Sequence, residues 1–207
     1  MLIPLRLSAM SDEQLMQRAA QGSDRAFEEL YNRHARRLKG FFVRRLGNDA
    51  DLAADFMHDT FLRLYSARET YREGRGFRPW LYTIAYNLIK NHFRNQLAIV
   101  REEEARPGAR RFSDEKVRPG ASRFSDEKAD DTDIELEMDT ATFRDALHKA
   151  LKILPEPYAM LFSLHYEEEL TIPQIAQITE LPEGTVKSRL HKAMNFIKKE
   201  LKQYENR

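Results

Sequence analysis

The 207-residue sequence contains no cysteine, and glycine and proline contribute only eight residues each. The absence of cysteine excludes a disulfide framework, a thiolate zinc site and a cysteine nucleophile. No apolar run reaches the roughly 18 residues of a membrane-spanning helix, and the apolar stretch at the N-terminus is too short for a signal peptide. We therefore expect a cytoplasmic protein that is not inserted in a membrane.

Signatures of the common enzyme classes are absent as well. The sequence has no P-loop, no H-E-x-x-H, no G-x-S-x-G and no paired catalytic carboxylates. Asp55, His58 and Asp59 form a cluster that suggests a metal, but acidic residues near the start of a helix are also favoured by its dipole. We expect no enzymatic activity, no cofactor and no metal site.

Charge is unevenly distributed along the chain, although the formal net charge is only +1. Residues 1–100 carry 16 basic and 11 acidic residues, a balance of +5, whereas residues 101–139 carry 8 and 13, a balance of −5. Residues 140–207 carry 10 and 9. An acidic block between two others predicts two folded domains, 1–100 and 140–207, joined by a flexible linker.

Apolar residues at three- and four-residue spacing predict a helical bundle in the first domain, and the fold class is all-α. A capping box of Ser11 and Gln14 begins the first helix, and a long second helix begins at Asp24. His34 lies on the apolar stripe of that helix and is interpreted as a core histidine. The third and fourth helices are expected over residues 49–65 and 77–95.

The third helix presents an acidic outer face. Its exposed residues are expected to be Asp51, Asp55, Asp59, Leu62 and Arg63. An acidic ridge beside an exposed leucine is better suited to binding a partner than to catalysis.

A loop at residues 66–76 and the helix after it combine cations with aromatic rings. The loop contains Tyr71, Arg72 and Arg75, although solubility alone explains a basic loop equally well. The outer side of the helix is predicted to carry a line at four-residue spacing, flanked by Asn87: Arg78, Tyr82, Tyr86, Lys90 and Arg94. Aromatic rings stack on unpaired bases while cations hold the phosphates, so this pattern indicates a single-stranded nucleic-acid site.

The linker contains a direct repeat, ARPGARRFSDEK followed by VRPGASRFSDEK. Two copies of so short a unit are too few for a repeat fold, and duplication of a disordered segment explains them. Phe112 and Phe124 are candidate docking anchors. The acidic end of the linker either imitates nucleic acid in a basic channel or is simply solvated, and the residues do not decide between the two.

The second domain ends in two helices separated by a break. Thr171 and Gln174 predict a capping box with Pro173 in the first turn, and residues 180–184 are expected to reverse the chain through Pro182 and Gly184. The last helix has one apolar stripe and one basic face, and that face holds Lys187, Ser188, His191, Lys192, Asn195, Lys198 and Lys199. This order indicates a helix-turn-helix that binds duplex DNA; a helical hairpin in a bundle is the alternative.

The segments FRPWLYTIAYNLIKNHFR and LTIPQIAQITELPEGTVKSRLHKAMNFIKKEL carry a specific resemblance. With AFEELYNRHARRLKGFFVRRLG and DLAADFMHDTFLRLY, they resemble regions 2 and 4 of the extracytoplasmic-function (ECF) class of RNA polymerase sigma factors. The resemblance covers nearly everything outside residues 101–139. It implies an alternative sigma factor that binds promoter DNA and core RNA polymerase, through the clamp helices and the flap, under the control of an anti-sigma factor.

The resemblance also implies roles for individual residues. The docking face for the clamp helices would contain Asp55, Asp59, Phe61 and Leu62, with His58 where the family usually has glutamine. The loop at residues 71–76 would capture a flipped base, with Tyr82, Asn87, Lys90 and Arg94 near the separated strand. The upstream promoter element would be contacted by Glu183, Thr185, Lys187, Ser188, Arg189 and Lys192.

Two other functions remain open from the residues. A dimeric helix-turn-helix regulator would act without polymerase on a palindromic site, but leaves the line from Arg78 to Arg94 unexplained. An RNA-binding adaptor that uses residues 66–94 would not need the helix-turn-helix.

Overall fold

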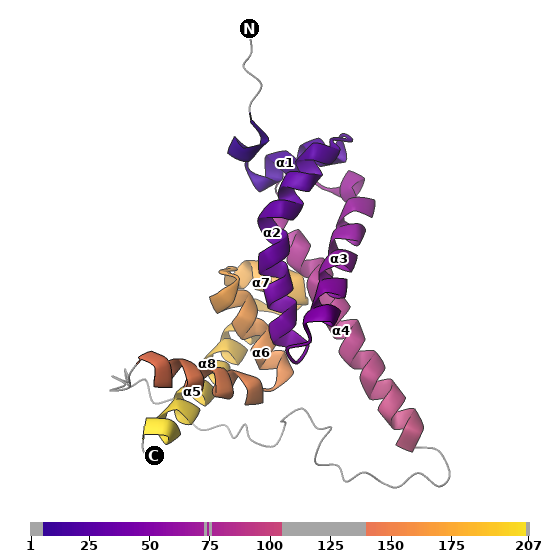
Figure 1. Cartoon of the computed structure of the whole chain (residues 1–207). Helices are drawn as coiled ribbons and strands as arrows, with labels where there is room; N and C mark the ends of the chain where they lie inside the picture. Colours follow the sequence, from indigo (N-terminus) through magenta and orange to yellow (C-terminus); the bar gives the residue numbers. More distant parts are fainter. Residues whose placement is uncertain (1–5, 73, 75, 105–139, 206–207) are drawn as a thin grey trace. The chain divides into compact units, whose positions relative to one another are not determined.

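The computed structural model describes residues 6–72, 74, 76–104 and 140–205, and every regular element in these ranges is helical (Figure 1). The prediction of an all-α fold with two helical units is confirmed. Within these ranges, none of the helices combines the length and the apolar character that crossing a membrane requires. The linker repeat, Phe112, Phe124 and Arg75 lie outside the described residues.

The first unit begins with a short 3-10 turn, η1 (Leu7–Ala9), and helix α1 (Asp12–Ala20). The predicted capping box is present, because the N–H of Gln14 donates to Ser11 Oγ and the N–H of Ser11 donates to Gln14 Oε1. Helix α2 (Asp24–Arg45) packs against α1 and α3. Its buried side includes Leu30, Leu38, Phe41 and Phe42.

Helix α3 (Ala50–Ser66) is capped by Asp49, whose carboxylate accepts from two backbone N–H groups of the first turn. A 3-10 turn, η2 (Arg68–Thr70), follows, and the last helix of this unit is α4 (Phe77–Glu104). Helix α4 therefore continues past residue 100, where the sequence predicted the end of the domain. The predicted domain boundaries otherwise stay predictions.

The second unit is built mainly by α5 (Thr140–Ile153), α6 (Glu156–Phe162), α7 (Ile172–Thr179) and α8 (Glu183–Glu205). A π turn, η3 (Ser163–Glu167), follows α6. The core of the unit joins α5, α6 and α8 through alanines, aliphatic side chains and one phenylalanine: Ala146, Ala150, Leu154, Ala159, Phe162, Ala193, Ile197 and Leu201. The predicted stripe of α8 is thus confirmed over its length.

The turn between α7 and α8 differs from the expectation at one residue. Glu180 adopts the left-handed conformation with φ 59°, and the N–H of Leu181 donates to the carbonyl of Ala176. The carbonyl of Pro182 then accepts from the backbone N–H groups of Thr185 and Val186 in the first turn of α8. Gly184 already lies inside α8, so the prediction that it provides the reversal is wrong. Helix α7 ends at Thr179, and Glu180 is its left-handed C-cap, whereas Pro182 directly precedes Glu183, the first residue of α8.

Candidate nucleic-acid and partner-binding surfaces

The outer face of α8 is a continuous polar surface. Glu183, Lys187, Ser188 and His191 are exposed, whereas Thr185, Arg189 and Lys192 are half-buried. These residues lie in the first three turns of the helix, opposite the buried stripe that begins with Val186. A duplex approaching this face meets the N-terminal half of the helix, which is the part that enters the major groove in helix-turn-helix proteins.

Helix α7 is held at its start by the predicted pair of residues. Gln174 Oε1 accepts from the backbone N–H of Thr171 at 2.9 Å and from its hydroxyl at 3.1 Å. Pro173 lies in the first turn, where a backbone N–H has no helical acceptor. Ile175 and Ile178 are buried, so this short helix is fixed both at its cap and along its inner side. Helix α7, the first helix of the helix-turn-helix, is therefore fixed in place in the same way as α8, by a buried inner side.

The acidic ridge on α3 comprises Asp51, Asp55 and Asp59, with Leu62 beside them. Asp51 and Asp55 are exposed, and Asp59 pairs with Arg63 at 3.1 Å on the surface. Leu62 is 67% exposed, an unusual position for a large aliphatic side chain. Water screens the exposed Asp59–Arg63 pair, so it contributes little to stability. The ridge is therefore available to a partner.

Phe61 does not belong to this ridge, and the prediction that it lies on the docking face is wrong. It is only 3% exposed, and its ring centroid lies 4.7 Å from that of Tyr31 and 6.2 Å from that of Phe27 on α2. Its position four residues after Met57 places it on the buried side of α3. His58 is exposed and its ring stacks on Tyr31 at 6.2 Å.

The predicted line along the outside of α4 is only partly correct. Tyr82 is 2% exposed, and its ring meets Phe41 of α2 edge to face at 5.4 Å, so its assignment to the outer side is wrong. An α-helix advances 3.6 residues per turn, so each step of four residues rotates by about 40°, and four steps rotate by about 160°. A line from Arg78 to Arg94 therefore winds around the helix.

The remaining members of the line do reach the surface. Asn87, Lys90 and Arg94 are exposed, and Arg78 and Tyr86 are half-buried. Lys90 Nζ lies 5.9 Å from the centre of the Tyr86 ring. A cation beside a partly exposed aromatic ring preserves the combination that suits an unpaired strand. The candidate surface on α4 thus extends from Arg78 to Arg94 but is interrupted at Tyr82.

The turn before α4 supplies the rest of this surface. Arg72 is exposed, whereas Tyr71 is half-buried with its ring centroid 5.3 Å from that of Trp80 on α4. Gly74 and Gly76 have φ values of 88° and 69°, which residues with a side chain rarely adopt. A Cβ on Gly76 would also meet the Pro79 ring at 3.2 Å. The turn therefore requires glycine at the residue directly before the helix.

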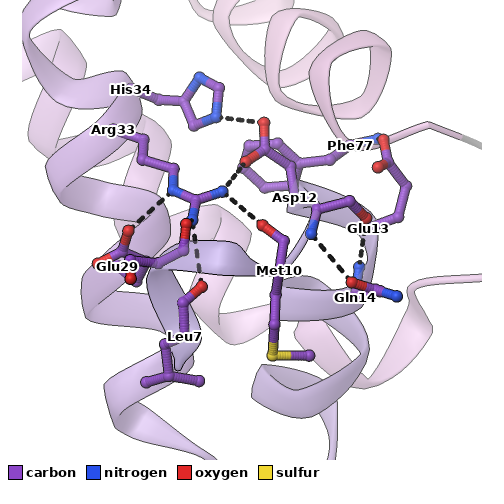
Figure 2. Close-up of polar contacts among 11 residues, drawn as sticks. Leu7, Met10, Asp12, Glu13, Gln14, Glu29, Arg33, His34 and Phe77 are labelled. Atoms are coloured by element: carbon purple, nitrogen blue, oxygen red, sulfur yellow. Dashed lines mark hydrogen bonds and ion pairs between the residues drawn. The ribbon is translucent and has the colours of Figure 1, made fainter. Parts of the chain in front are cut away.

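A cluster around Arg33 was not predicted as functional. Its guanidinium donates to Leu7 O, Ser8 O, Met10 O, Asp12 Oδ1 and Glu29 Oε1, at 2.9 to 3.2 Å (Figure 2). His34 Nε2 lies 2.7 Å from Asp12 Oδ2. We call Arg33, Asp12, His34 and Glu29 the Arg33 clamp. Sequence spacing reveals the pair of Glu29 and Arg33, four residues apart, but the partners more than 20 residues away leave no local signal.

The contacts within the Arg33 clamp shift the pKa values of two of its residues, Asp12 and Arg33. Hydrogen bonding to His34 lowers the pKa of Asp12, with Arg33 acting in the same direction and partial burial opposing it. Desolvation works against the charge of Arg33, but its bonds to Glu29 and Asp12 raise its pKa overall. A lowered carboxyl pKa stabilises the fold at pH values above the ordinary pKa of 3.8, and this contribution is lost as the pH falls through the lower, folded-state value. Asp12 is therefore ionised at neutral pH, as its pairing with Arg33 requires.

Comparisons with known proteins match both units. Residues 30–98 match the family model described as sigma-70 region 2, and residues 144–197 match sigma-70 region 4. The chain is 31% identical over 199 residues to the RNA polymerase sigma-H factor of Pseudomonas aeruginosa, covering 94% of this chain and 96% of the relative. It is 27% identical to the ECF RNA polymerase sigma-E factor of Haemophilus influenzae, covering 93% and 96%.

A solved structure has the same fold. The sigma factor RpoE of Bartonella quintana, in complex with the anti-sigma factor NepR, matches with a TM-score of 0.60 at 19% identity, covering 85% of this chain and 96% of RpoE. A helix-turn-helix unit and a separate four-helix unit that match regions 4 and 2 define a transcription initiation factor of the sigma-70 type. Within that type, the chain belongs to the ECF sigma factors.

Proposed function

We propose that this sigma factor places its two units on the two elements of one promoter while it is bound to core RNA polymerase. The observation that supports the proposal is the presence of two different surfaces, one on α8 and one around the turn before α4. The first is a single polar helix face suited to duplex DNA, and the second combines cations with aromatic rings. The chain itself performs no covalent chemistry in this role.

The α8 face would contact the upstream element in its major groove. Lys187 and Arg189 would donate to phosphates or to guanine edges, and Ser188 to either. Glu183 at the first turn is suited to accept from a cytosine amino group. These contacts would fix both the register and part of the sequence preference.

The surface on α4 would hold the separated strand of the downstream element. Arg72, Lys90 and Arg94 would contact phosphates, while Asn87 and the Tyr86 ring would contact bases. A flipped base would stack near Tyr71 at the turn. Tyr71 already lies against Trp80 with its ring tilted by 36°, so the base would add a third ring to an existing aromatic pair.

The acidic ridge with Leu62 would bind the clamp helices of the polymerase. A large exposed leucine that inserts into an apolar pocket supplies affinity, and the surrounding carboxylates select a basic partner surface. We also infer cytoplasmic action and control by an anti-sigma factor. The support for the latter is the RpoE–NepR complex, whose sigma factor shares this fold.

Reconstituted transcription tests the proposal. Core polymerase with this protein should start transcripts at sites that core polymerase alone does not use, and Asp55→Lys with Asp59→Lys should abolish copurification with the core enzyme. Asp131→Lys with Asp133→Lys in the linker, which makes the same change of charge outside the ridge, serves as the matched control. Unchanged initiation upon adding the protein would refute the function, and normal copurification of the double variant would refute the placement of the docking face. Promoter binding as a dimer without polymerase would instead indicate the regulator.

A further inference from the structure

The turn before α4 rests on α1 at both of its ends. Helix α1 contacts η2, which precedes the turn, and also contacts α4, which follows it. At the second contact, the backbone N–H of Phe77 donates to Glu13 Oε1 at 3.2 Å. Phe77 is the first residue of α4, so its N–H has no acceptor within the helix. Glu13 therefore caps a helix that begins 64 residues later in the chain.

The Arg33 clamp holds α1 in the position from which Glu13 reaches Phe77 (Figure 2). Asp12, the neighbour of Glu13, is bound by Arg33 at 3.0 Å and by His34 at 2.7 Å. The same guanidinium binds three backbone carbonyls before α1, so that the segment cannot slide along α2 without breaking several bonds. The ring of His34 also lies 5.0 Å from the Phe77 ring. One cluster on α2 thus fixes α1 and the start of α4 together.

We propose that Glu13, held by the Arg33 clamp, is a positioning residue for the binding of the unpaired promoter strand. It fixes the first turn of α4, and with it Trp80 and the Tyr71 ring that packs on Trp80. This inference rests on the proposed function of that surface. The clamp itself contacts no nucleic acid in this arrangement, and its effect passes through the backbone of Phe77.

The negative charge of Glu13 affects DNA binding in a second way, apart from its hydrogen bond to Phe77. The carboxylate of Glu13 stabilises the start of the helix through the helix dipole, but as an anion it also repels the phosphates of DNA. Pairing with the Phe77 N–H keeps this carboxylate directed toward the helix terminus. Loss of the side chain would therefore loosen the turn even though it removes a repulsive charge, so a stronger affinity for DNA in the variant would contradict the proposal.

The test uses holoenzyme and two promoter DNAs. One is a fork junction whose downstream element is single-stranded, and the other is a duplex that carries only the upstream element. We expect Glu13→Ala to weaken fork binding by about three- to tenfold, the range that corresponds to the net contribution of one typical hydrogen bond. Binding to the upstream duplex and affinity for core polymerase should stay unchanged, and the melting temperature should fall only slightly, because a single helix cap is lost. Glu28→Ala, which removes an exposed glutamate of α2, is the matched control and should have no effect.

A second pair of variants separates positioning from stability. Arg33→Lys keeps the charge but lacks the planar guanidinium group that reaches several acceptors. This variant should therefore weaken binding of the fork-junction DNA in the same way. Ala35→Gly lowers the stability of α2 through helix propensity without removing a member of the clamp. Fork binding that falls equally in Ala35→Gly and Glu13→Ala, or that is unchanged in Glu13→Ala, would overturn the inference. If wild-type holoenzyme bound the fork junction no more tightly than core enzyme alone does, the proposed function would be overturned as well.

Discussion

The two candidate nucleic-acid surfaces are built in different ways. The face on α8 follows from one helix whose buried and polar residues alternate at helical spacing, so each side chain is placed by its own element. The surface around the start of α4 depends on α1, α2 and η2 as well as on α4. A surface that one helix creates tolerates changes elsewhere in the unit, whereas a surface that four elements create does not.

The largest change in stability is expected for substitution of Tyr82, and it tests whether the α4 surface depends on packing against other helices. Because this residue is buried against Phe41, Tyr82→Ala should cost about 3–5 kcal/mol, as aromatic truncations in cores do. The free energy of unfolding of the first unit, measured by denaturant titration, checks this. The matched variant is Asn87→Ala, one helical turn further along and exposed, for which we expect unchanged stability.

The opposite outcome at Tyr82 would have a clear meaning. A Tyr82→Ala variant with wild-type stability and reduced fork binding would return this residue to the outer face of α4. The surface would then be one helix face, as on α8, and the contrast between the two units would disappear.

A smaller effect is expected on the α8 face. Lys187→Ala removes an exposed ammonium from the proposed DNA surface and should weaken binding of holoenzyme to the upstream duplex by about 1 kcal/mol, or roughly fivefold. If Lys187 contacts a phosphate, the slope of log affinity against log salt should fall by about 0.9. Stability of the second unit should not change, because Lys187 lies outside its core.

The control for Lys187 lies on the same unit. Lys152→Ala removes an exposed lysine from the last turn of α5 and should leave both the affinity and the salt slope unchanged. Equal losses in the two variants would show that net charge, rather than placement on α8, determines the affinity. The position of Lys187 on α8 would then have no role in orienting the protein on the DNA.

Features that depend on one helix are predicted correctly from the sequence, whereas features that depend on several elements are not. The helices, the capping residues Ser11 and Thr171 and the stripe of α8 depend on neighbours within a few residues, and these predictions are confirmed. The predicted exposure of Tyr82 is wrong because a spacing pattern gives one helix face but not the number of helices that cover it. The docking role of Phe61 follows from the family resemblance and not from spacing, and its burial contradicts it. Both lie where α2 packs from the side.

The Arg33 clamp illustrates the remaining limit. Its acceptors are three backbone carbonyls and two carboxylates from separate segments. Backbone carbonyls are present at every residue, so no side-chain pattern marks them as partners. In sequence, Arg33 is one of several cations on α2 and carries no distinguishing feature. The bond from Phe77 to Glu13 spans 64 residues and is equally invisible.

The smallest expected effect concerns the turn between α7 and α8, where the sequence suggested Gly184 and the structure assigns Glu180. Left-handed backbone costs a residue with a side chain about 1–2 kcal/mol, and glycine costs more backbone entropy, so Glu180→Gly should stabilise the second unit by about 0.5–1 kcal/mol. Gly184 is helical, and a Cβ there would meet no atom within 4 Å. Gly184→Ala should therefore also stabilise the unit, by up to about 1 kcal/mol.

The two substitutions form a reciprocal test, read from the melting temperature of the second unit. If Gly184 provided the reversal, Gly184→Ala would destabilise the unit and Glu180→Gly would destabilise a helix. The two assignments thus predict opposite signs for both variants. Since neither change adds or removes a cation on the α8 face, duplex affinity should change little. A variant that gains stability but loses duplex affinity would show that the turn sets the angle at which α8 meets DNA, and this surface too would then depend on more than one element.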